Sequence, residues 1–186
     1  MSKKENIMID TEQRLFYLSD EIDNTSIGTM CFNLLRLLQS DDEQEEKEKN
    51  FKRQPIKIYI NSYGGTIYDM WSLIDIITNS KTPIYTYCLG YAMSAGFMIF
   101  LAGHKRFIGK NATLLYHQLS GGQIGKYTDI KQNIEEYDRV QADIEIYVIN
   151  RTKISKEKII EIREKKIDWY IHSENAIDYG IADEVI

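Results

Sequence analysis

The spacing of apolar residues changes along the chain, and each spacing predicts a different kind of element. In residues 26–39 the apolar side chains recur every three or four positions, which predicts an amphipathic helix. Residues 67–77 and 127–150 repeat this spacing. Short runs rich in β-branched and aromatic residues occupy positions 14–18, 56–60, 84–88, 106–108 and 113–116. Strands that alternate with helices in this way predict an α/β fold with a largely parallel sheet.

Two stretches depart from this alternation. Residues 41–54 form a charged run without helical period, for which we predict a solvated loop or the frayed end of a helix. The helix predicted over residues 127–150 is long, so we expect it to project from the domain or to pack against a partner. Neither the segment before residues 41–54 nor the segment after them looks like a complete domain alone, so this run is not a domain boundary. A length of 186 residues fits a single domain.

Composition narrows the class of protein. Hydrophobic residues make up 43% of the chain, which is enough for a folded core, and the net charge of −5 argues against a nucleic-acid-binding surface. The two cysteines, Cys31 and Cys88, each lie in an apolar run and form no disulfide framework. We expect them to be buried free thiols in a reducing compartment, and therefore expect a cytoplasmic protein.

An uncharged stretch, residues 83–103, is long enough to be considered as a membrane span. Thr86, Ser94 and Gly96 interrupt its hydrophobicity, and it divides better into a strand, a turn and a helix. Residues 1–10 contain no apolar segment of the kind found in secretory signals. The sequence therefore predicts neither a membrane span nor a secretory signal.

Histidine is scarce, so the three histidines can be compared directly as candidate general bases. His104 lies in a basic turn and His172 precedes a helix start, whereas His117 directly follows the apolar run at 113–116. The carboxyl end of a buried strand is where α/β folds place functional groups. A structural histidine held by hydrogen bonds is the alternative for His117.

Ser94 is the candidate nucleophile. It joins a strand to the helix predicted over residues 94–101, and the small residues Ala92 and Gly96 stand two positions to either side. This arrangement is similar to a nucleophile elbow, in which a sharp turn exposes the hydroxyl. The helix that follows offers backbone N–H groups to an oxyanion. A simple helix cap is the alternative role for Ser94.

A glycine pair, Gly64 and Gly65, closes another strand and can bring bare backbone N–H groups up to a substrate. The pair could also cradle a phosphate, but the sequence lacks the glycine patterns of phosphate-binding loops. It also lacks the HExxH and CxxC patterns of metal sites. Serine chemistry requires a base and an acceptor that orients the base, and spacing alone does not choose that acceptor.

Several of these segments together resemble the ClpP family, the proteolytic subunits of ATP-dependent Clp proteases. The resemblance rests on INSYGG ending at Gly65, GYAMSAG around Ser94, YHQ around His117, the pair Gly121-Gly122, and the closing YGIADEVI. It implies a crotonase-like spiral of ββα units with a protruding strand-helix handle. The handle would be residues 119–150, and the head would be residues 14–118 and 151–186.

The resemblance implies a serine endopeptidase without metal or cofactor. Ser94 would be the nucleophile, His117 the base and Asp168 the acid that orients the base. The backbone N–H groups of Gly65 and Ala95 would form the oxyanion hole. Peptide substrates would add as a β-strand along the handle strand at residues 120–125, with substrate-binding positions at Gly64, Gly121, Gly122, Gln123 and Ile124.

For assembly, the resemblance implies rings of seven subunits, stacked in pairs around a chamber and served by an AAA+ unfoldase of the ClpX or ClpA type. The chain departs from the family at four places. Two concern the active-site turns: Tyr63 and Leu119 replace prolines, and Ala95 replaces a common Met. Two concern assembly: Lys166-Ile167 replaces an Asp-Arg pair that couples ring stacking to activity, and the N-terminal segment lacks the usual loop that contacts the ATPase. A single ring, an ATPase-independent phage-type peptidase, a non-catalytic ring subunit and a thioester enzyme of the same fold stay open as alternatives.

Overall fold

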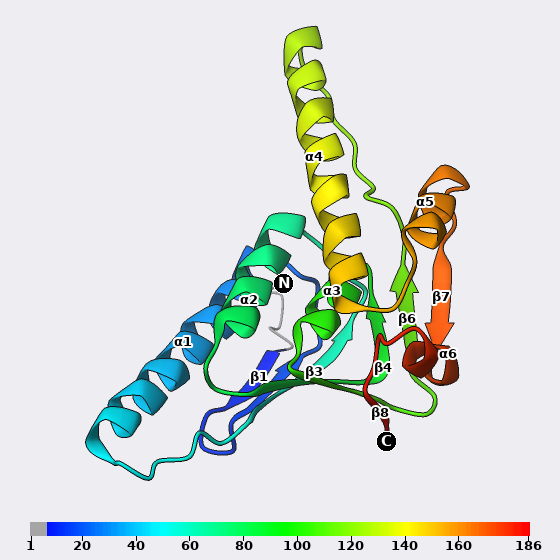
Figure 1. The fold of residues 1–186 in the computed structure, drawn as a ribbon. Helices are drawn as coiled ribbons and strands as arrows, with labels where there is room; N and C mark the ends of the chain where they lie inside the picture. The colour runs from blue at the N-terminus through cyan, green and yellow to red at the C-terminus, as the bar shows by residue number, and fades with distance from the viewer. Residues whose placement is uncertain (1–6) are drawn as a thin grey trace, which may run out of the picture.

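One mixed sheet forms the centre of the molecule in a computed structural model that describes residues 7–186 (Figure 1). Within these residues the strands are β1 (Ile7–Asp10), β2 (Leu15–Leu18), β3 (Ile56–Ser62), β4 (Ile84–Met93), β5 (Lys105–Ile108), β6 (Thr113–Tyr116), β7 (Trp169–His172) and β8 (Glu184–Val185). The helices are α1 (Asn24–Lys47), α2 (Ile67–Asn79), α3 (Ala95–Ala102), α4 (Tyr127–Arg151), α5 (Lys156–Glu164) and α6 (Ser173–Asp178). The prediction for the N-terminal segment concerns in part residues 1–6, which lie outside the described residues.

The sheet is largely parallel, as the alternation of strands and helices predicts. Strands β2, β3, β4, β5 and β8 pair in parallel, and only the β1–β2 and β6–β7 pairs within residues 7–186 are antiparallel. The three strands absent from the prediction are β1, β7 and β8, which are short. The predicted α/β class is confirmed.

The long strand β4 has two neighbours on the same side, one after the other. Its first half, Tyr85 to Cys88, pairs with β5, and its second half, Tyr91 to Met93, pairs in parallel with β6. The strand changes partner at Gly90, where a Cβ atom would lie 2.4 Å from the side-chain oxygen of Asn61. As a result, β4 and β6 end side by side and deliver the residues that follow them to one place.

Helix α3 explains the long uncharged stretch of the sequence. All eight of its side chains are buried, and α2 and the sheet pack around it. The guanidinium of Arg151 donates to the carbonyl oxygens of Leu101, Ala102 and Gly103 and so satisfies the end of this buried helix. The predicted strand, turn and helix are confirmed as β4, Ser94 and α3. Within residues 7–186, no helix has the length and hydrophobicity needed to cross a membrane.

The long helix α4 projects away from the sheet, as its predicted length suggests (Figure 1). Its buried residues, Val140, Ile144 and Val148, all lie in the half nearest the sheet. Residues 118–126 run outward beside it from β6 to its tip, but the described chain contains no strand pairing for them. The handle strand expected over residues 120–125 stays a prediction, because a strand needs a neighbour to satisfy its backbone groups and the single chain offers none there.

The charged run at residues 41–54 is solvated over most of its length, as its composition predicts, since residues 42–50 are all exposed. Helix α1 continues through it to Lys47, and Asp41 is only 2% exposed. Both carboxylate oxygens of Asp41 accept from the guanidinium of Arg14, at 3.0 and 2.7 Å, and Oδ2 also accepts from the Thr82 hydroxyl at 2.6 Å. The prediction fails at Asp41 because these partners come from distant parts of the chain.

Asp41→Ala should lower the free energy of unfolding by about 3–5 kcal/mol, because it leaves the largely buried Arg14 guanidinium without its carboxylate. Urea denaturation of the variant and the wild type measures this loss. Asp42→Ala is the matched control, since Asp42 is exposed and its partner Arg53 keeps Glu45. Equal losses of unfolding free energy for the two variants would show that the buried Arg14–Asp41 pair stabilises the fold no more than the pair of the exposed Asp42 with Arg53.

Candidate active site

Ser94 occupies a sharp turn between β4 and α3. Its φ is 53° and its ψ is −121°, a conformation that residues with side chains rarely adopt. Its N–H donates to the carbonyl of Leu115 on β6 at 2.9 Å, and its own carbonyl accepts from Met98 in the first turn of α3. This strand–turn–helix geometry is that of a nucleophile elbow, in which backbone strain exposes the side chain.

The glycine turn before α2 packs directly against this elbow. A Cβ atom on Gly64 would lie 2.8 Å from the Ser94 Cβ, and one on Gly65 would lie 2.1 Å from the Ile22 carbonyl oxygen. Both glycines have positive φ, at 108° and 154°. Only glycine therefore allows the backbone to approach Ser94 so closely.

The backbone N–H groups of Gly65 and Ala95 are available for a ligand. Neither group donates to any acceptor within residues 7–186, and both residues line the same pocket as Ser94. Ala95 is the first residue of α3, where N–H groups have no partner inside the helix. Two unpaired donors beside a serine hydroxyl form the arrangement that binds an oxyanion.

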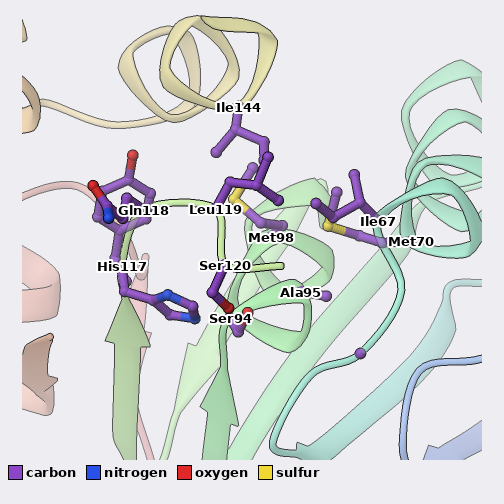
Figure 2. A pocket seen from close by; sticks show the side chains of 12 residues that line it. Ile67, Met70, Ser94, Ala95, Met98, His117, Gln118, Leu119, Ser120 and Ile144 are labelled. Carbon is purple, nitrogen blue, oxygen red and sulfur yellow. The ribbon is translucent and has the colours of Figure 1, made fainter. Parts of the chain in front are cut away.

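His117 follows the last residue of β6 and is half-buried. Figure 2 shows its imidazole turned toward Ser94 and Ser120, and all three residues line one pocket. The parallel pairing of β4 with β6 brings Ser94 and His117 together. Among the described residues, no hydrogen bond links His117 to Ser94. The other two histidines, His104 and His172, are exposed and do not line this pocket.

Asp168 directly precedes β7. The antiparallel β6–β7 ladder ends at the pair Tyr116–Trp169, so His117 and Asp168 each stand one residue beyond its end. The Asp168 side chain is exposed and makes no hydrogen bond within residues 7–186. The fold thus brings the acid beside the histidine, while its carboxylate stays in solvent.

An apolar pocket opens beside Ser94 (Figure 2). Its apolar wall consists of Ile67, Met70, Met98, Leu119 and Ile144. Sequence reasoning does not identify these residues as a binding surface, because apolar residues at helical spacing indicate a core equally well. The pocket can hold an apolar side chain next to the serine hydroxyl.

The remaining sequence-predicted substrate residues lie elsewhere. Gly121, Gly122, Gln123 and Ile124 are exposed and do not line the pocket that contains Ser94. Gly64 contacts Ser94 through the backbone but lines a different hollow. That hollow also contains Tyr63, whose ring packs on Tyr91 with centroids 4.3 Å apart. Residues 121–124 are therefore not brought to the serine within a single chain.

The cysteine thiols do not compete as nucleophiles. Burial raises the pKa of Cys88 to about 12 and also raises the pKa of Cys31. A thiol attacks as its thiolate, which burial disfavours in both residues. Both cysteines are free, and Cys88 is fully buried on β4 as the sequence predicts, but the same prediction is wrong for Cys31, which is only partly buried on α1.

Comparison with known protein families identifies the family of the chain. The family model described as Clp protease matches residues 4–186, which is essentially the whole chain. The matched range spans the glycine turn before α2, Ser94 and His117. The chain therefore belongs to the Clp protease family.

Proposed function

We propose that the protein is a serine endopeptidase with Ser94 as nucleophile and His117 as general base. One observation carries the proposal: a positive-φ serine at the start of α3 shares a pocket with a histidine at the end of the neighbouring parallel strand. A serine hydroxyl is a weak nucleophile unless a base lies near enough to take its proton. Purified protein should cleave fluorogenic peptides, and the absence of cleavage by the assembled protein would count against the proposal.

In the proposed reaction, the Ser94 hydroxyl oxygen attacks the peptide carbonyl carbon while His117 accepts the hydroxyl proton. The carbonyl oxygen becomes an oxyanion that accepts from the N–H groups of Gly65 and Ala95. The intermediate then expels the amine, which takes the proton from His117, and an ester to Ser94 remains. Water repeats the attack with His117 as base, which releases the carboxylic acid and restores Ser94.

Asp168 is proposed as the acid that orients His117. The β6–β7 register supports this role, because the ladder ends at Tyr116 and Trp169, the residues next to His117 and Asp168. The exposed carboxylate must turn onto the imidazole to act. Catalytic hydrogen bonds are often loose in ligand-free enzymes and tighten when the substrate binds.

Asp168→Asn should lower kcat by about 100- to 10,000-fold with little change in KM, because an amide cannot stabilise the imidazolium that forms during attack. Steady-state peptide hydrolysis measures both constants. Asp178→Asn, an exposed aspartate on α6, is the matched control and should behave as wild type. Wild-type kinetics for the Asp168 variant would assign the orienting role to another acceptor.

The apolar pocket beside Ser94 supports a preference for apolar residues immediately before the scissile bond. Methionine, isoleucine and leucine side chains form its wall, and a charged side chain would lose its hydration there. The unpaired backbone of residues 121–124 supports the proposal that a peptide adds as a strand beside it.

Peptides with Leu before the scissile bond should be cleaved about 100-fold more efficiently, in kcat/KM, than the same peptides with Asp. A matched set of fluorogenic peptides that differ only at this residue measures the ratio. The Ala peptide should fall between the two. Equal values for Leu and Asp would mean that this pocket does not bind that side chain.

Membership of the Clp protease family implies an oligomer that acts on peptides. We propose that the oligomer is a ring of seven subunits, with substrate delivered by an AAA+ unfoldase of the ClpX or ClpA type. Exposed apolar side chains at Ile124, Tyr127 and Ile134 on the outer part of the handle support burial against another subunit. The division into head and handle, the stacking of two rings, the need for an ATPase and the cytoplasmic location stay predictions.

A further inference from the structure

A chain of hydrogen bonds joins the segment that carries His117 to the helix that leads to Asp168. The N–H of Leu119 donates to Oε1 of Gln141 at 2.7 Å, and Nε2 of Gln141 donates to Oε1 of Glu145 at 2.8 Å. Nη1 of Arg163 then donates to both oxygens of Glu145, at 3.0 and 3.1 Å. Three segments are thereby linked: the segment after β6 that contains Leu119, helix α4 and helix α5.

Gln141 is chemically suited to the middle of this chain. An amide side chain accepts through its oxygen and donates through its nitrogen, so it can satisfy a backbone N–H and a carboxylate at once. Leu119 is half-buried, where an unpaired N–H would be costly. The link exists only because residue 119 is not the proline usual in the family, since proline has no N–H to donate.

At the far end of this series of hydrogen bonds, an ion pair joins Glu145 to Arg163. The Glu145 side chain is 12% exposed, so its carboxylate depends on Arg163 for compensation. Arg163 lies in the last turn of α5, and the N–H of Lys166 donates to its carbonyl oxygen. The following residue, Ile167, is bonded back to Ile162, and Asp168 comes directly after it. The position of α5 therefore sets where the backbone of Asp168 begins.

We propose that Gln141 is a positioning residue of the active site. Through Leu119 it fixes the segment two residues beyond His117, and through Glu145 and Arg163 it fixes the segment before Asp168. The hydrogen bonds thereby position both His117 and Asp168 relative to one helix, α4. This inference rests on the proposed serine peptidase function and adds a residue that touches neither substrate nor the reacting atoms.

The test uses Gln141→Leu, Leu119→Pro and the double variant that carries both changes. Gln132→Leu is the matched control. Gln132 lies on the same helix, is exposed and makes no hydrogen bond within residues 7–186. Ser94 labelling by a small fluorophosphonate, which does not need the apolar pocket, is followed together with kcat and KM for a peptide. For each variant, the size of the particle in solution reports assembly, and the midpoint of thermal unfolding reports folding.

Gln141→Leu should slow labelling and lower kcat by about 10- to 100-fold, the scale expected for a misplaced catalytic group, while KM stays within about twofold. Leu119→Pro removes the same hydrogen bond without altering α4 and should slow labelling to a similar extent, whereas its KM also reflects the loss of Leu119 from the pocket wall. The double variant should be no slower than the worse single variant, because both changes remove one interaction. Gln132→Leu should match the wild type.

Wild-type labelling rates in Gln141→Leu, or losses that multiply in the double variant, would overturn the positioning role and leave the proposed function intact. A loss of activity in Gln141→Leu that only follows a loss of assembly, together with wild-type labelling by an assembled Leu119→Pro, would overturn it as well. Failure of the assembled wild type to label at Ser94 would instead contradict the proposed function itself. The two failures are therefore distinguishable.

Discussion

Ser94→Ala should abolish peptide hydrolysis, with a loss in kcat of about 10⁶-fold, as expected when the nucleophile of a serine peptidase is removed. The turn at Ser94 gives the physical reason. Its backbone takes a strained positive φ, which holds the hydroxyl at the mouth of the apolar pocket and beside two unpaired N–H donors. An alanine keeps the turn and the donors but has no oxygen to attack the carbonyl.

Initial rates with a fluorogenic peptide measure this loss, and gel filtration checks that the variant assembles as the wild type does. Ser40→Ala, an exposed serine on α1, is the matched control and should keep full activity. Residual activity in Ser94→Ala near the wild-type level would remove Ser94 from the mechanism. Ser120, which lines the same pocket, would then become the first serine to examine.

His117→Ala should cause a loss of similar size, about 10⁶-fold in kcat, because an unassisted serine keeps its proton. The loss should be about the same in the double variant with Ser94→Ala, since the two residues act as one unit. Steady-state hydrolysis of the same peptide measures each variant. The expected residual rate comes from substrate binding and the oxyanion donors alone.

His172→Ala is the matched control for this variant. His172 is exposed, lies at the other end of β7 from Asp168 and does not line the pocket. It should behave as wild type. An active His117→Ala enzyme would show that another group takes the Ser94 proton. The parallel pairing of β4 with β6 would then not explain how Ser94 is activated.

The parts of the fold that local periodicity specifies are predictable from the sequence. The apolar spacing of α2 and α4 and the β-rich runs of β3, β4 and β6 each lie within a few residues of where the sequence predicts them. The elbow is also predictable, since small residues on both sides of Ser94 and a strand before it point to a tight turn. Local chemistry alone is enough for these features.

Features that depend on contacts between distant segments are not predictable in this way. Asp41 reads as one charge in a solvated run, yet Arg14 and Thr82 enclose it. Strand β7 is too short to show a period, so the sequence cannot place Asp168 beside His117 without a resemblance to a known family. The polar residue Gln141 on the helix surface reads as solvated, and only the folded chain brings the Leu119 N–H to it.

The most direct test of the account is the reaction of the assembled protein with a fluorophosphonate, followed by intact mass and peptide mapping. We predict one adduct per chain, located on Ser94, that is absent from both Ser94→Ala and His117→Ala. An adduct on another serine, or an equal amount of labelling in His117→Ala, would contradict the account. So would an assembled wild-type protein that does not react, because an exposed and activated serine is its central claim.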